Sequence, residues 1–524
     1  MRSLVRSAAR PYVCPSCQLS RLPARRRFAS HSTPSSASPE IYDVVCVGGG
    51  PAGLGLLAAL RASPATSKLK VALVETQDLQ KAGSWSLDAQ HYSNRVSSLT
   101  PSSVSFLQKI GVWDHVDTAR VQPYQEMQVW DGETGSRITF DWSMETSPFE
   151  DLRTVATMTE NSNLVRALLS RIAESGDENL SIFSNTTVSS IANGSEIPDG
   201  PDLSAWPVLS LAPTTSSPAQ PPKQIAARLL VGADGINSPV RRFADISTSG
   251  WDYDRHGVVA TLSLSDLDPV HFPLNMKTAY QRFLPALGGP IALLPLPNNN
   301  ASLVWSTTVA NAAYLKSLPP RAFIAMVNAA FRLSMTDLSY MLRMERPSTT
   351  SSPASSTSTP TPTLDPHEDE LTWRLQHTPQ PRKPSQLPPV VNGVQEGTVA
   401  SFPLRFRHAS SYISPRVALV GDAAHVIHPL AGQGLNLGLG DVAALARTVQ
   451  YAATHGMDVG DILTLERYAG DRFATNAKIG AACDVLHKLY NVPGNGPVAW
   501  ARSFGLDVID KVPFVKGLLM KGVE

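Results

Sequence analysis

The stretch IYDVVCVGGGPAGLGLLAALRASPATSKLKVALVETQ, residues 41–77, determines the fold that we predict for this chain. It opens with a short run of β-branched and apolar residues, 41–47, which is typical of a buried strand. After a glycine-rich turn, apolar residues recur at helical intervals from 54 to 60. A second apolar run, VALV at 71–74, predicts a further strand, so the whole stretch indicates a strand–helix–strand unit.

Three glycines and one acid predict that this unit binds a dinucleotide. Gly48, Gly50 and Gly53 have the G-x-G-x-x-G spacing between the first strand and the helix, and Glu75 follows the second strand. Gly48 permits the tight turn, Gly50 lets a pyrophosphate approach the backbone, and Gly53 lets the helix and the strand pack closely. The helix N-terminus offers N–H groups to the phosphates, and an acid placed like Glu75 accepts hydrogen bonds from a ribose. The fingerprint alone does not distinguish NAD from FAD.

Two more buried strands end in an acid beside a glycine. The stretch ARLLVGADGINSPVRR ends its strand in Asp234-Gly235. The stretch RVALVGDAAHVIHPLAGQGLNLGLGDVAAL ends its strand in Gly421-Asp422 and continues into two histidines, a proline and several glycines.

Composition limits the classes of function. The 524 residues are 42% hydrophobic and 17% charged, which suits two or three folded domains. Residues 1–39 contain seven Arg and no acid, and the remaining chain has 38 basic against 44 acidic residues, a net charge of −6. This balance argues against nucleic acid as the main partner. No stretch approaches the roughly 18 apolar residues of a membrane-spanning helix, so we expect any membrane contact to be peripheral.

The Arg-rich and Ser-rich N-terminus, residues 1–39, has the composition of a mitochondrial transit peptide. A disordered basic arm is the alternative. Cys14 and Cys17 in this segment form one CxxC pair, but a zinc site normally takes four ligands and the chain offers no second pair. We therefore predict no metal there.

Two segments rich in Ser, Thr and Pro are predicted to be unfolded. They are residues 345–397 and, more briefly, about 198–224. Such sequences bury too little apolar surface to offset the entropy lost on ordering. We expect both to be surface insertions.

The glycine triplet, the Asp234-Gly235 motif and the Gly421-Asp422 motif, in this order, resemble those of the flavin-dependent aromatic hydroxylases of the para-hydroxybenzoate hydroxylase type. The resemblance implies FAD as the cofactor. It also implies an α/β fold in which a Rossmann-like FAD-binding domain is interleaved with a β-sheet substrate domain and followed by a C-terminal helical segment.

The resemblance gives the glycine-rich loop a role. Asp422 is expected to bind the ribityl chain of FAD, because a carboxylate accepts strong hydrogen bonds from hydroxyl groups. A helix that begins near Gly432 or Gly434 would point its N-terminus at the pyrimidine edge of the flavin, where the reduced ring carries negative charge. Pro429 should stiffen the loop beside the ring.

Two histidines on the same loop allow three interpretations. With Asp422, His425 and His428 could form an Asp-x2-His-x2-His metal site, or they could hold the loop or line the pocket, or they could relay protons. We favour the structural role, because the loop is already committed to the flavin.

Further stretches resemble, more narrowly, the mitochondrial ring hydroxylases of ubiquinone biosynthesis. They are SNRVSSLTPSSVSFLQKIGVWDHV, TENSNLVRALL and TAYQRFLPALGGPIALLPLPNNNASLVWSTT, the last of which, 278–308, predicts three strands over the active site. This family implies that Arg95 and Asn161 touch the flavin, whereas a surface ion pair is the alternative for Arg95. The predicted FAD-binding residues are Gly48, Gly50, Gly53, Glu75, Arg95, Asn161, Asp234, Gly235, Gly421, Asp422, Pro429, Gly432 and Gly434. No residue is singled out as catalytic.

The resemblance implies a reaction and its partners. Reduced FAD and molecular oxygen would hydroxylate a 4-hydroxybenzoate that carries a prenyl tail, meta to its carboxyl group, or a later methoxy-prenylphenol, through a flavin hydroperoxide. A ferredoxin and its reductase are the implied electron source, with other ubiquinone-biosynthesis proteins as complex partners. Two alternatives stay open: a soluble NADPH-dependent phenol hydroxylase of the same fold, and a non-catalytic flavoprotein subunit.

These inferences give a domain map and a location. We expect the protein on the matrix side of the mitochondrial inner membrane, held peripherally by an apolar helix from Pro513 to the C-terminus, for which an ordinary helix that covers the core is the alternative. Arg241 and Arg242 are the nearest basic pair to a flavin motif and are candidates for ferredoxin docking, or for an ion-paired helix start. The predicted domains are a transit peptide at 1–39, an FAD-binding domain at 40–115, 155–245 and 398–470, a substrate domain at 116–154 and 246–344, a disordered insertion at 345–397 and a C-terminal helical region at 471–524.

Overall fold

The computed structural model describes residues 38–86, 91–141, 154–176, 178–197, 200–214, 223–265, 277–345, 365–379, 384–429 and 432–490. The predicted transit peptide, apart from its last two residues, and the predicted membrane helix from Pro513 lie outside these residues. Among the helices described, none is both long and apolar enough to cross a membrane.

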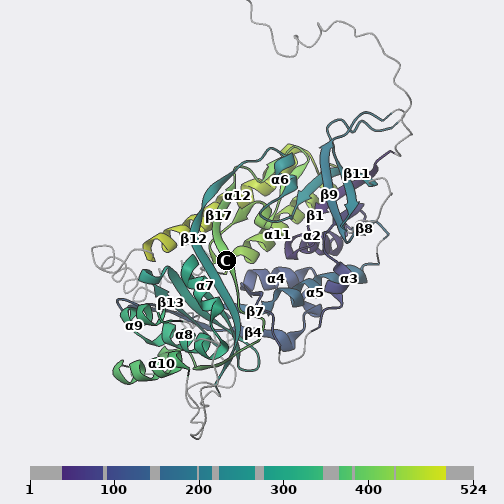
Figure 1. The fold of residues 1–524 in the computed structure, drawn as a ribbon. Helices are drawn as coiled ribbons and strands as arrows, with labels where there is room; N and C mark the ends of the chain where they lie inside the picture. The colour runs from purple at the N-terminus through teal and green to yellow at the C-terminus, as the bar shows by residue number, and fades with distance from the viewer. Residues whose placement is uncertain are drawn as a thin grey trace, which may run out of the picture. The chain divides into compact units, whose positions relative to one another are not determined.

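The nucleotide-binding half of the molecule is built on an eight-stranded sheet (Figure 1). Six strands follow one another in the order β18-β19-β11-β1-β2-β8, and β10 and β9 extend it from β11. The pairs from β19 to β8 are all parallel. The strands are β1 (Glu40–Val47), β2 (Val71–Val74), β8 (Leu180–Phe183), β9 (Thr186–Asn193), β10 (Pro207–Pro213), β11 (Lys223–Gly232), β18 (Ile413–Ser414) and β19 (Val417–Leu419).

The apolar composition of its strands explains why this sheet lies buried between helices. The strands β2 and β19 are buried along their whole length, as expected when helices cover both faces of a parallel sheet. The long helix α11 (Gly434–Thr454) packs against both α2 (Pro51–Ala62) and α12 (Ile462–Tyr490). The helix α5 (Asn161–Glu174) packs against α2 and against α3 (Leu79–Gly83). These observations confirm the predicted strand–helix–strand unit and its α/β class.

The second half is a nine-stranded, largely antiparallel sheet in the order β20-β17-β12-β15-β14-β13-β5-β6, with β16 paired to β12. The predicted strands within 278–308 are present as three neighbours of this sheet. Its strands are β5 (Glu126–Asp131), β6 (Arg137–Asp141), β12 (Thr248–Leu264), β13 (Thr278–Leu284), β14 (Gly289–Leu296), β15 (Asn300–Thr308), β16 (Val391–Val394), β17 (Ala400–Ala409) and β20 (His425–Val426).

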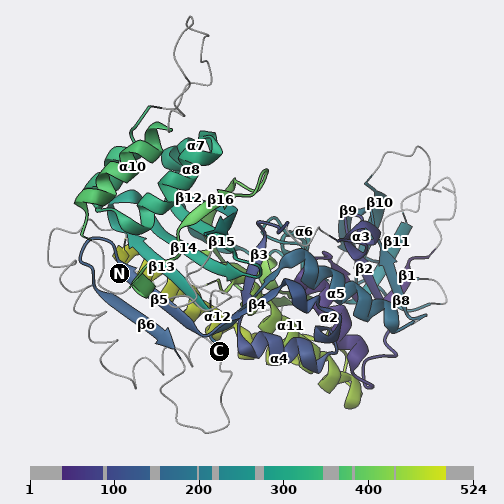
Figure 2. The same ribbon diagram turned by 90° about the horizontal axis from the view of Figure 1, so that it is seen from below.

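The two faces of the nine-stranded sheet carry different layers. On one face, Trp130 packs with the core of α8 (Pro320–Arg332), while on the other the neighbouring Val129 packs with Tyr490 at the end of α12. This follows from the alternation of side chains along a strand. Figure 2 shows α7 (Val309–Ser317), α8 and α10 (Pro366–His377) gathered on one side of the strands. The helix α9 (Met335–Met341) contacts α8 and α10.

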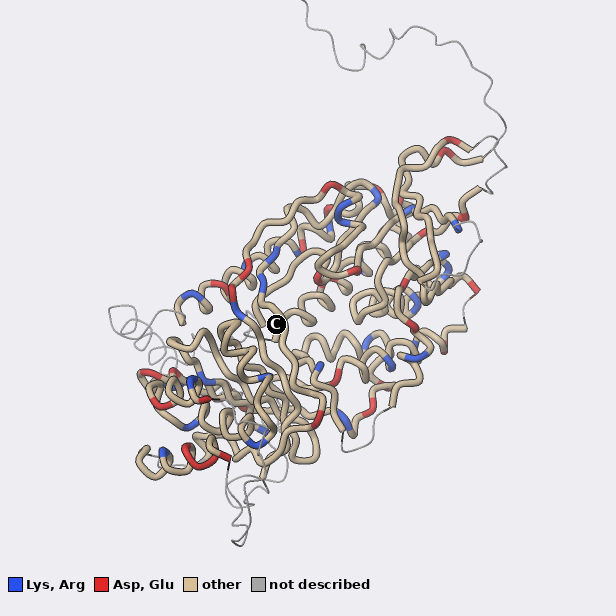
Figure 3. Tube along the Cα trace, viewed as in Figure 1, with Lys and Arg blue, Asp and Glu red and all other residues tan. Residues whose placement is uncertain are grey.

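A small three-stranded sheet, β3-β7-β4, contacts β14 of the large sheet and is followed by helices of the nucleotide-binding half. Its strands are β3 (Val96–Leu99), β4 (Val121–Tyr124) and β7 (Ala156–Glu160), and α4 (Pro101–Lys109) follows β3. Figure 3 shows basic and acidic residues interleaved along the trace, with long uncharged stretches through the strands.

The structure corrects the predicted insertion at 345–397. Its residues 365–379 and 384–397 contain α10 and β16. Leu371 of α10 and Val391 of β16 belong to the core beneath α8. Asn328 bonds both backbone groups of Val391, at 2.8 and 3.0 Å. Within this segment only 346–364 and 380–383 lie outside the described residues. The overall Ser-, Thr- and Pro-rich composition therefore did not indicate the helix and the strand that lie between its low-complexity parts.

Other predicted boundaries also differ. The shorter segment at 198–224 contains β10, which pairs with β9 and β11. The helix α12 is continuous across the predicted boundary at 470/471. Segment 398–470 contains β17 and β20 of the large sheet as well as β18 and β19 of the eight-stranded sheet, and β4 and β7 pair in the small sheet although they stand in different predicted domains. For the strands, pairing between distant parts of the chain decides which sheet a segment joins, and the local sequence pattern does not reveal that pairing.

Candidate functional site

The three sequence motifs converge at one edge of the eight-stranded sheet. The strands β1, β11 and β19 are parallel neighbours, so the loops after them leave from the same edge. Backbone hydrogen bonds join these loops: Ala233 N donates to Val47 O at 2.8 Å, and Val420 N donates to Gly232 O at 2.9 Å. Ligands of open parallel sheets bind at this edge. The predicted site is therefore assembled from segments almost 400 residues apart.

Each glycine of the first motif has a distinct geometric reason. Gly48 has φ of +108°, and a Cβ on it would lie 2.3 Å from the carbonyl oxygen of Ala233. A Cβ on Gly53 would lie 1.9 Å from the carbonyl oxygen of Gly48. A Cβ on Gly50, in contrast, would meet nothing within 4 Å. Two glycines therefore serve packing, whereas the third leaves space in front of the helix.

The N-terminus of α2 faces that space without a side-chain cap. Its N-cap residue is Gly50, and no side chain accepts a hydrogen bond from its first turn. Pro51 stands at the first helical position, where its missing N–H costs nothing. The first-turn amides thus remain available to an anion.

Glu75 occupies the end of β2 beside this loop. Its carboxylate accepts a hydrogen bond from the backbone N–H of Gly49 and another, of 2.7 Å, from that of Gln77. These bonds orient the carboxylate at the strand end.

The Asp234-Gly235 motif contributes a carboxylate whose contacts are incomplete. Asp234 Oδ2 accepts a hydrogen bond from Val240 N at 3.2 Å, while the buried Oδ1 has no partner in the described part of the chain. Burial raises the pKa of Asp234. Gly235, with φ of +78°, makes the turn that follows.

Arg241 has a structural contact that the sequence did not predict. Its guanidinium donates to the carbonyl oxygens of Ala423 at 2.7 Å and Ile236 at 2.6 Å. It therefore ties the loop after β11 to the loop after β19, which corrects its proposed availability for docking. Arg242 is exposed.

The Gly421-Asp422 motif lies between two helices. Gly421 has φ of +59°; a Cβ on it would lie 3.5 Å from Ala52 Cβ of α2, and a Cβ on Gly438 of α11 would lie 3.4 Å from Gly421 Cα. The Asp422 side chain is open to solvent, yet surrounding protein atoms exclude enough water to raise the pKa of its carboxyl. Hydrogen bonds from hydroxyl groups would stabilise the ionised form of this poorly hydrated carboxylate.

Asp441 of α11 holds this loop in place. One carboxylate oxygen accepts a hydrogen bond from His425 Nε2 at 2.6 Å and another from the N–H of Gly421 at 3.1 Å. The other oxygen accepts from Arg472 Nε at 2.9 Å and from Asn476 Nδ2 at 2.8 Å, both on α12. Burial alone would raise the pKa of Asp441, but His425 and Arg472 outweigh it and keep the pKa below its usual value. His425 therefore holds the loop.

His428 has different surroundings. Its ring lies 5.0 Å from that of Tyr253 and 4.6 Å from that of His487, and neither ring nitrogen has a partner among the described residues. Burial and then His487 lower the pKa of His428 to about 3, and burial and then Arg255 lower the pKa of His487 to about 4. Both rings are consequently neutral at ordinary pH. In the described part of the chain, no three His, Cys, Asp or Glu side chains are grouped to hold a metal ion.

The N-terminus of α11 is joined to β3 through Asn436. The Asn436 amide donates to the carbonyl oxygens of Ser98 at 2.8 Å and Gly432 at 3.2 Å, and accepts from Thr100 N at 3.0 Å. Gly432 has φ of +62°, and its N–H donates to Pro429 O at 3.1 Å. The neighbouring Leu430 and Ala431 are not described.

Two features leave this helix end open to a ligand. A Cβ on Gly434, the first residue of α11, would meet nothing within 4 Å, and no side chain in the described part of the chain caps the helix. The buried side-chain oxygen of Gln433 has no partner among the described residues. The helix begins at Gly434, the second of the two predicted starting points.

Arg95 and Asn161 lie beside each other next to β3. The Asn161 N–H donates to Arg95 O at 3.0 Å, and its side-chain oxygen accepts from Ser97 Oγ at 2.6 Å. The Arg95 side chain is exposed and forms no ion pair with any described residue. Arg95 stands three residues before Ser98, the partner of Asn436, and Asn161 bonds to Ser97 beside it, so both join the framework that connects the predicted site residues.

Some residues of the framework were not singled out from the sequence: Asp441, Asn436, Arg472 and Asn476. Asp441 and Asn436 stand within the quoted stretch GQGLNLGLGD, where polar residues interrupt an apolar helix, and that interruption was a usable signal. Arg472 and Asn476 recur at helical spacing on α12, but only the fold shows that they face Asp441.

The framework fits a flavin dinucleotide. The space before Gly50 and the uncapped α2 suit a pyrophosphate, Glu75 suits a ribose, and Asp422 suits a hydroxylated chain. The uncapped N-terminus of α11 suits an electron-rich ring edge. These hydrogen-bonding groups lie at the end of β2, in the loop after β1, in the loop after β19 and at the N-terminus of α11.

Comparisons with known proteins agree with this fit. A family model described as "FAD binding domain" matches residues 41–314 and 359–474. The protein "Ubiquinone biosynthesis monooxygenase COQ6, mitochondrial" of Schizosaccharomyces pombe is 38% identical over 489 residues, which cover 92% of this chain and 91% of that protein. The protein of the same name from Homo sapiens is 34% identical over 510 residues, covering 94% and 96%.

Solved structures share the fold. The p-nitrophenol 4-monooxygenase PnpA from Pseudomonas putida DLL-E4 aligns with a TM-score of 0.59 at 16% identity, covering 93% of this chain and 98% of that chain. PqsL, a probable FAD-dependent monooxygenase from Pseudomonas aeruginosa, aligns with a TM-score of 0.58 at 20% identity, covering 89% and 100%. At these identities the likeness concerns the fold alone.

Proposed function

This chain belongs to the COQ6 family of FAD-dependent monooxygenases, and from that premise we propose that it hydroxylates the aromatic ring of a prenylated ubiquinone precursor. The proposed substrate is 4-hydroxy-3-polyprenylbenzoate, with the new hydroxyl meta to the carboxyl group. A later 2-methoxy-6-polyprenylphenol is a second candidate. Identity along nearly the whole chain is the observation that carries this proposal.

The cofactor and the protein divide the work. Bound FAD supplies the redox chemistry that activates molecular oxygen. The chain would bind and orient the cofactor: Gly50 and the α2 amides would hold its phosphates, Glu75 a ribose, and Asp422 its ribityl chain. The α11 N-terminus, held by Asn436, would stabilise the electron-rich edge of the ring. No separate acid–base pair is required for this role.

The remaining predicted residues support the same site. Gly48, Gly53 and Gly235 set backbone turns, and Arg95 and Asn161 flank the strand that receives Asn436. Asp234 offers its unpaired oxygen near the phosphate loop, and Gly421, Pro429, Gly432 and Gly434 allow the loop to approach the ring.

The substrate would lie toward the large sheet. Ile291 and Leu293 of the apolar run PIALLPL belong to the core under α8, so they are not available as a channel wall. Leu294 is on the opposite face, where it is only partly buried and packs against a cluster that includes Tyr92 and Met158. Its partial exposure, where the large and small sheets meet, makes Leu294 a better candidate than Ile291 or Leu293 for contact with a prenyl tail.

We propose a mitochondrial location at the matrix side of the inner membrane. The relatives are named as mitochondrial, and the substrate tail resides in lipid. The apolar stretch after Pro513 is the proposed anchor, so deletion of residues 513–524 should lower the membrane-bound fraction. Assembly with other ubiquinone-biosynthesis proteins and reduction by a ferredoxin with its reductase belong to the same proposal.

Quinone profiling tests the function. Cells that lack this protein should accumulate the prenylated precursor without its ring hydroxyl, and the wild-type chain should restore the product. Accumulation of a different intermediate would contradict the proposed step.

Two variants separate the alternatives. If the protein were a non-catalytic subunit, Asp422→Ala would lose flavin yet still restore product, whereas an enzyme loses both. Asp369→Ala, which removes an exposed carboxylate from α10, is the matched control and should restore product fully. If the protein were a soluble phenol hydroxylase, a small phenol would stimulate its oxidation of NADPH.

A further inference from the structure

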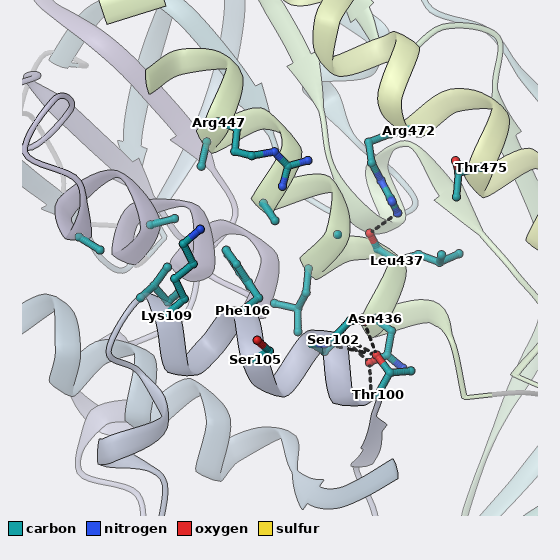
Figure 4. Close-up of a pocket in the computed structure, with 18 of the residues that line it drawn as sticks. Thr100, Ser102, Ser105, Phe106, Lys109, Asn436, Leu437, Arg447, Arg472 and Thr475 are labelled. Atoms are coloured by element: carbon teal, nitrogen blue, oxygen red, sulfur yellow. Dashed lines mark hydrogen bonds between the residues drawn. The ribbon is translucent and has the colours of Figure 1, made fainter. Parts of the chain in front are cut away.

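A groove lies on the outer side of α11, between that helix, α2, α4 and α12 (Figure 4). Its volume of about 630 Å³ is in the range of small-molecule sites. None of the residues predicted to hold FAD lines it. The groove therefore requires its own explanation.

Small residues along one face of α11 create the groove. Ala443 and Ala446, three residues apart, leave a low floor, whereas Gly440 before them leaves room for the guanidinium of Arg472, which would lie 2.8 Å from a Cβ at that position. Phe106 and Ile110 of α4 supply apolar surface beside them. The floor is thus suited to an apolar body.

The charges around the groove have one sign. Three of its lining residues are cationic, namely Lys109, Arg447 and Arg472, and none of them is acidic. Arg472 is engaged by Asp441. Lys109 has no partner among the described residues, and Arg447 has only Asp471 at 3.7 Å, with both side chains exposed. Exposed pairs of this length contribute little, so both cations are available.

Lys109 and Arg447 lie toward the same end of the groove, one from α4 and one from α11, away from Thr100 and Asn436 (Figure 4). Ser63, at the end of α2, also lines the groove. Two cations that offer N–H donors at one end of the groove match a phosphate group.

We propose that this groove binds a phosphate group attached to an apolar body, with the phosphate between Lys109 and Arg447 and the apolar part along the floor at Ala443. An anionic phospholipid has this chemistry. The inference rests on the groove itself and on no step of the proposed reaction, although a lipid site would suit an enzyme whose substrate resides in lipid.

Calorimetric titration of the flavin-loaded full chain tests this. The ligands are a water-soluble short-chain phosphatidylglycerol, the matching short-chain phosphatidylcholine, and inorganic phosphate. We expect phosphatidylglycerol to bind more tightly than either of the others. If inorganic phosphate binds as tightly, the ligand is a free phosphate and the role of the apolar floor is refuted; if none binds, the whole proposal is refuted.

Variants locate the site. Lys109→Ala with Arg447→Ala should weaken phosphatidylglycerol binding at least about tenfold, because two charge-assisted contacts are lost. Lys316→Ala with Arg343→Ala removes two exposed cations elsewhere and should bind like the wild type. Ala443→Leu should weaken lipid binding but not phosphate binding. Undiminished binding by the first double variant would place the ligand elsewhere and overturn the assignment.

Discussion

His425 Nε2 lies 2.6 Å from Asp441 Oδ2, and both side chains are buried. This contact joins the loop after β19, which carries Asp422, to the helix that begins at the glycine-rich loop. Asp422, which we propose binds the ribityl chain, and the helix end that we propose faces the flavin are thereby held as one unit. Asp441 is a positioning residue in this sense, since it acts through His425 and Gly421.

Replacing Asp441 should affect both stability and flavin binding. Asp441→Asn keeps the shape but leaves Arg472 without its carboxylate, and breaking a buried pair in this way costs about 3–5 kcal/mol of unfolding free energy. FAD affinity should fall as well, because the loop of Asp422 loses its anchor. Urea unfolding and flavin occupancy measure the two effects. Asp471→Asn, an exposed change on α12, should alter neither, and a stable Asp441→Asn protein with full flavin would refute the anchoring role.

Acid should destabilise the fold through His428 and His487. Their pKa values are lowered to about 3 and about 4, whereas an imidazole in the unfolded chain titrates near about 6.5. Below that pH the unfolded chain binds more protons than the folded chain. The two histidines therefore make their full contribution to the unfolding free energy above about pH 6.5, and this contribution is lost as the pH falls toward 4.

The variant His428→Phe isolates one of these protons. It should flatten the pH dependence by about 1.4 kcal/mol per pH unit between about pH 6 and 4, as measured by urea unfolding at each pH. The neighbouring Tyr253 and His487 remain in place as the internal reference. An unchanged slope would show that His428 is not buried in its neutral form.

Substitutions at two glycines of the first motif should affect folding and FAD binding differently. Gly50→Ala adds a methyl group that meets no protein atom, so the apoprotein should keep its stability while the phosphates of FAD are blocked. Gly53→Ala places a Cβ against the carbonyl oxygen of Gly48 and should destabilise the fold itself. Thermal unfolding without FAD, together with flavin occupancy, distinguishes the two. Full FAD occupancy in Gly50→Ala would exclude the proposed phosphate position.

The electron donor gives a kinetic prediction. NADPH alone should reduce the bound flavin slowly, and a ferredoxin with its reductase should do so quickly, with a rate that decreases as salt is added. Anaerobic bleaching of the flavin absorbance measures each rate. Rapid bleaching by NADPH alone would favour the soluble phenol hydroxylase instead.

The sequence predicted the parts of this fold that depend on local pattern. The strand–helix–strand unit at 41–77 and the three strands within 278–308 follow from periodicity and glycine spacing. The three strand-end motifs could be placed together because parallel strands share an edge.

Contacts between distant segments could not be predicted in the same way. The bonds of Asp441 to Arg472 and Asn476 depend on how α11 and α12 cross. The pairing of β16 with β12 orders part of a Pro-rich segment whose composition alone predicts an unfolded chain. Arg241 appeared to be a surface cation because the carbonyl group of Ala423 that binds it is 182 residues away in the sequence.

A single-turnover experiment tests the central claim most directly and needs no protein donor. The flavin-loaded protein is photoreduced without oxygen and then mixed with ¹⁸O-labelled dioxygen and 4-hydroxy-3-polyprenylbenzoate. The account predicts a ring-hydroxylated product that contains one labelled oxygen, formed as the flavin reoxidises. Reoxidation with hydrogen peroxide as the only oxygen product, or a product that carries unlabelled oxygen from water, would contradict it.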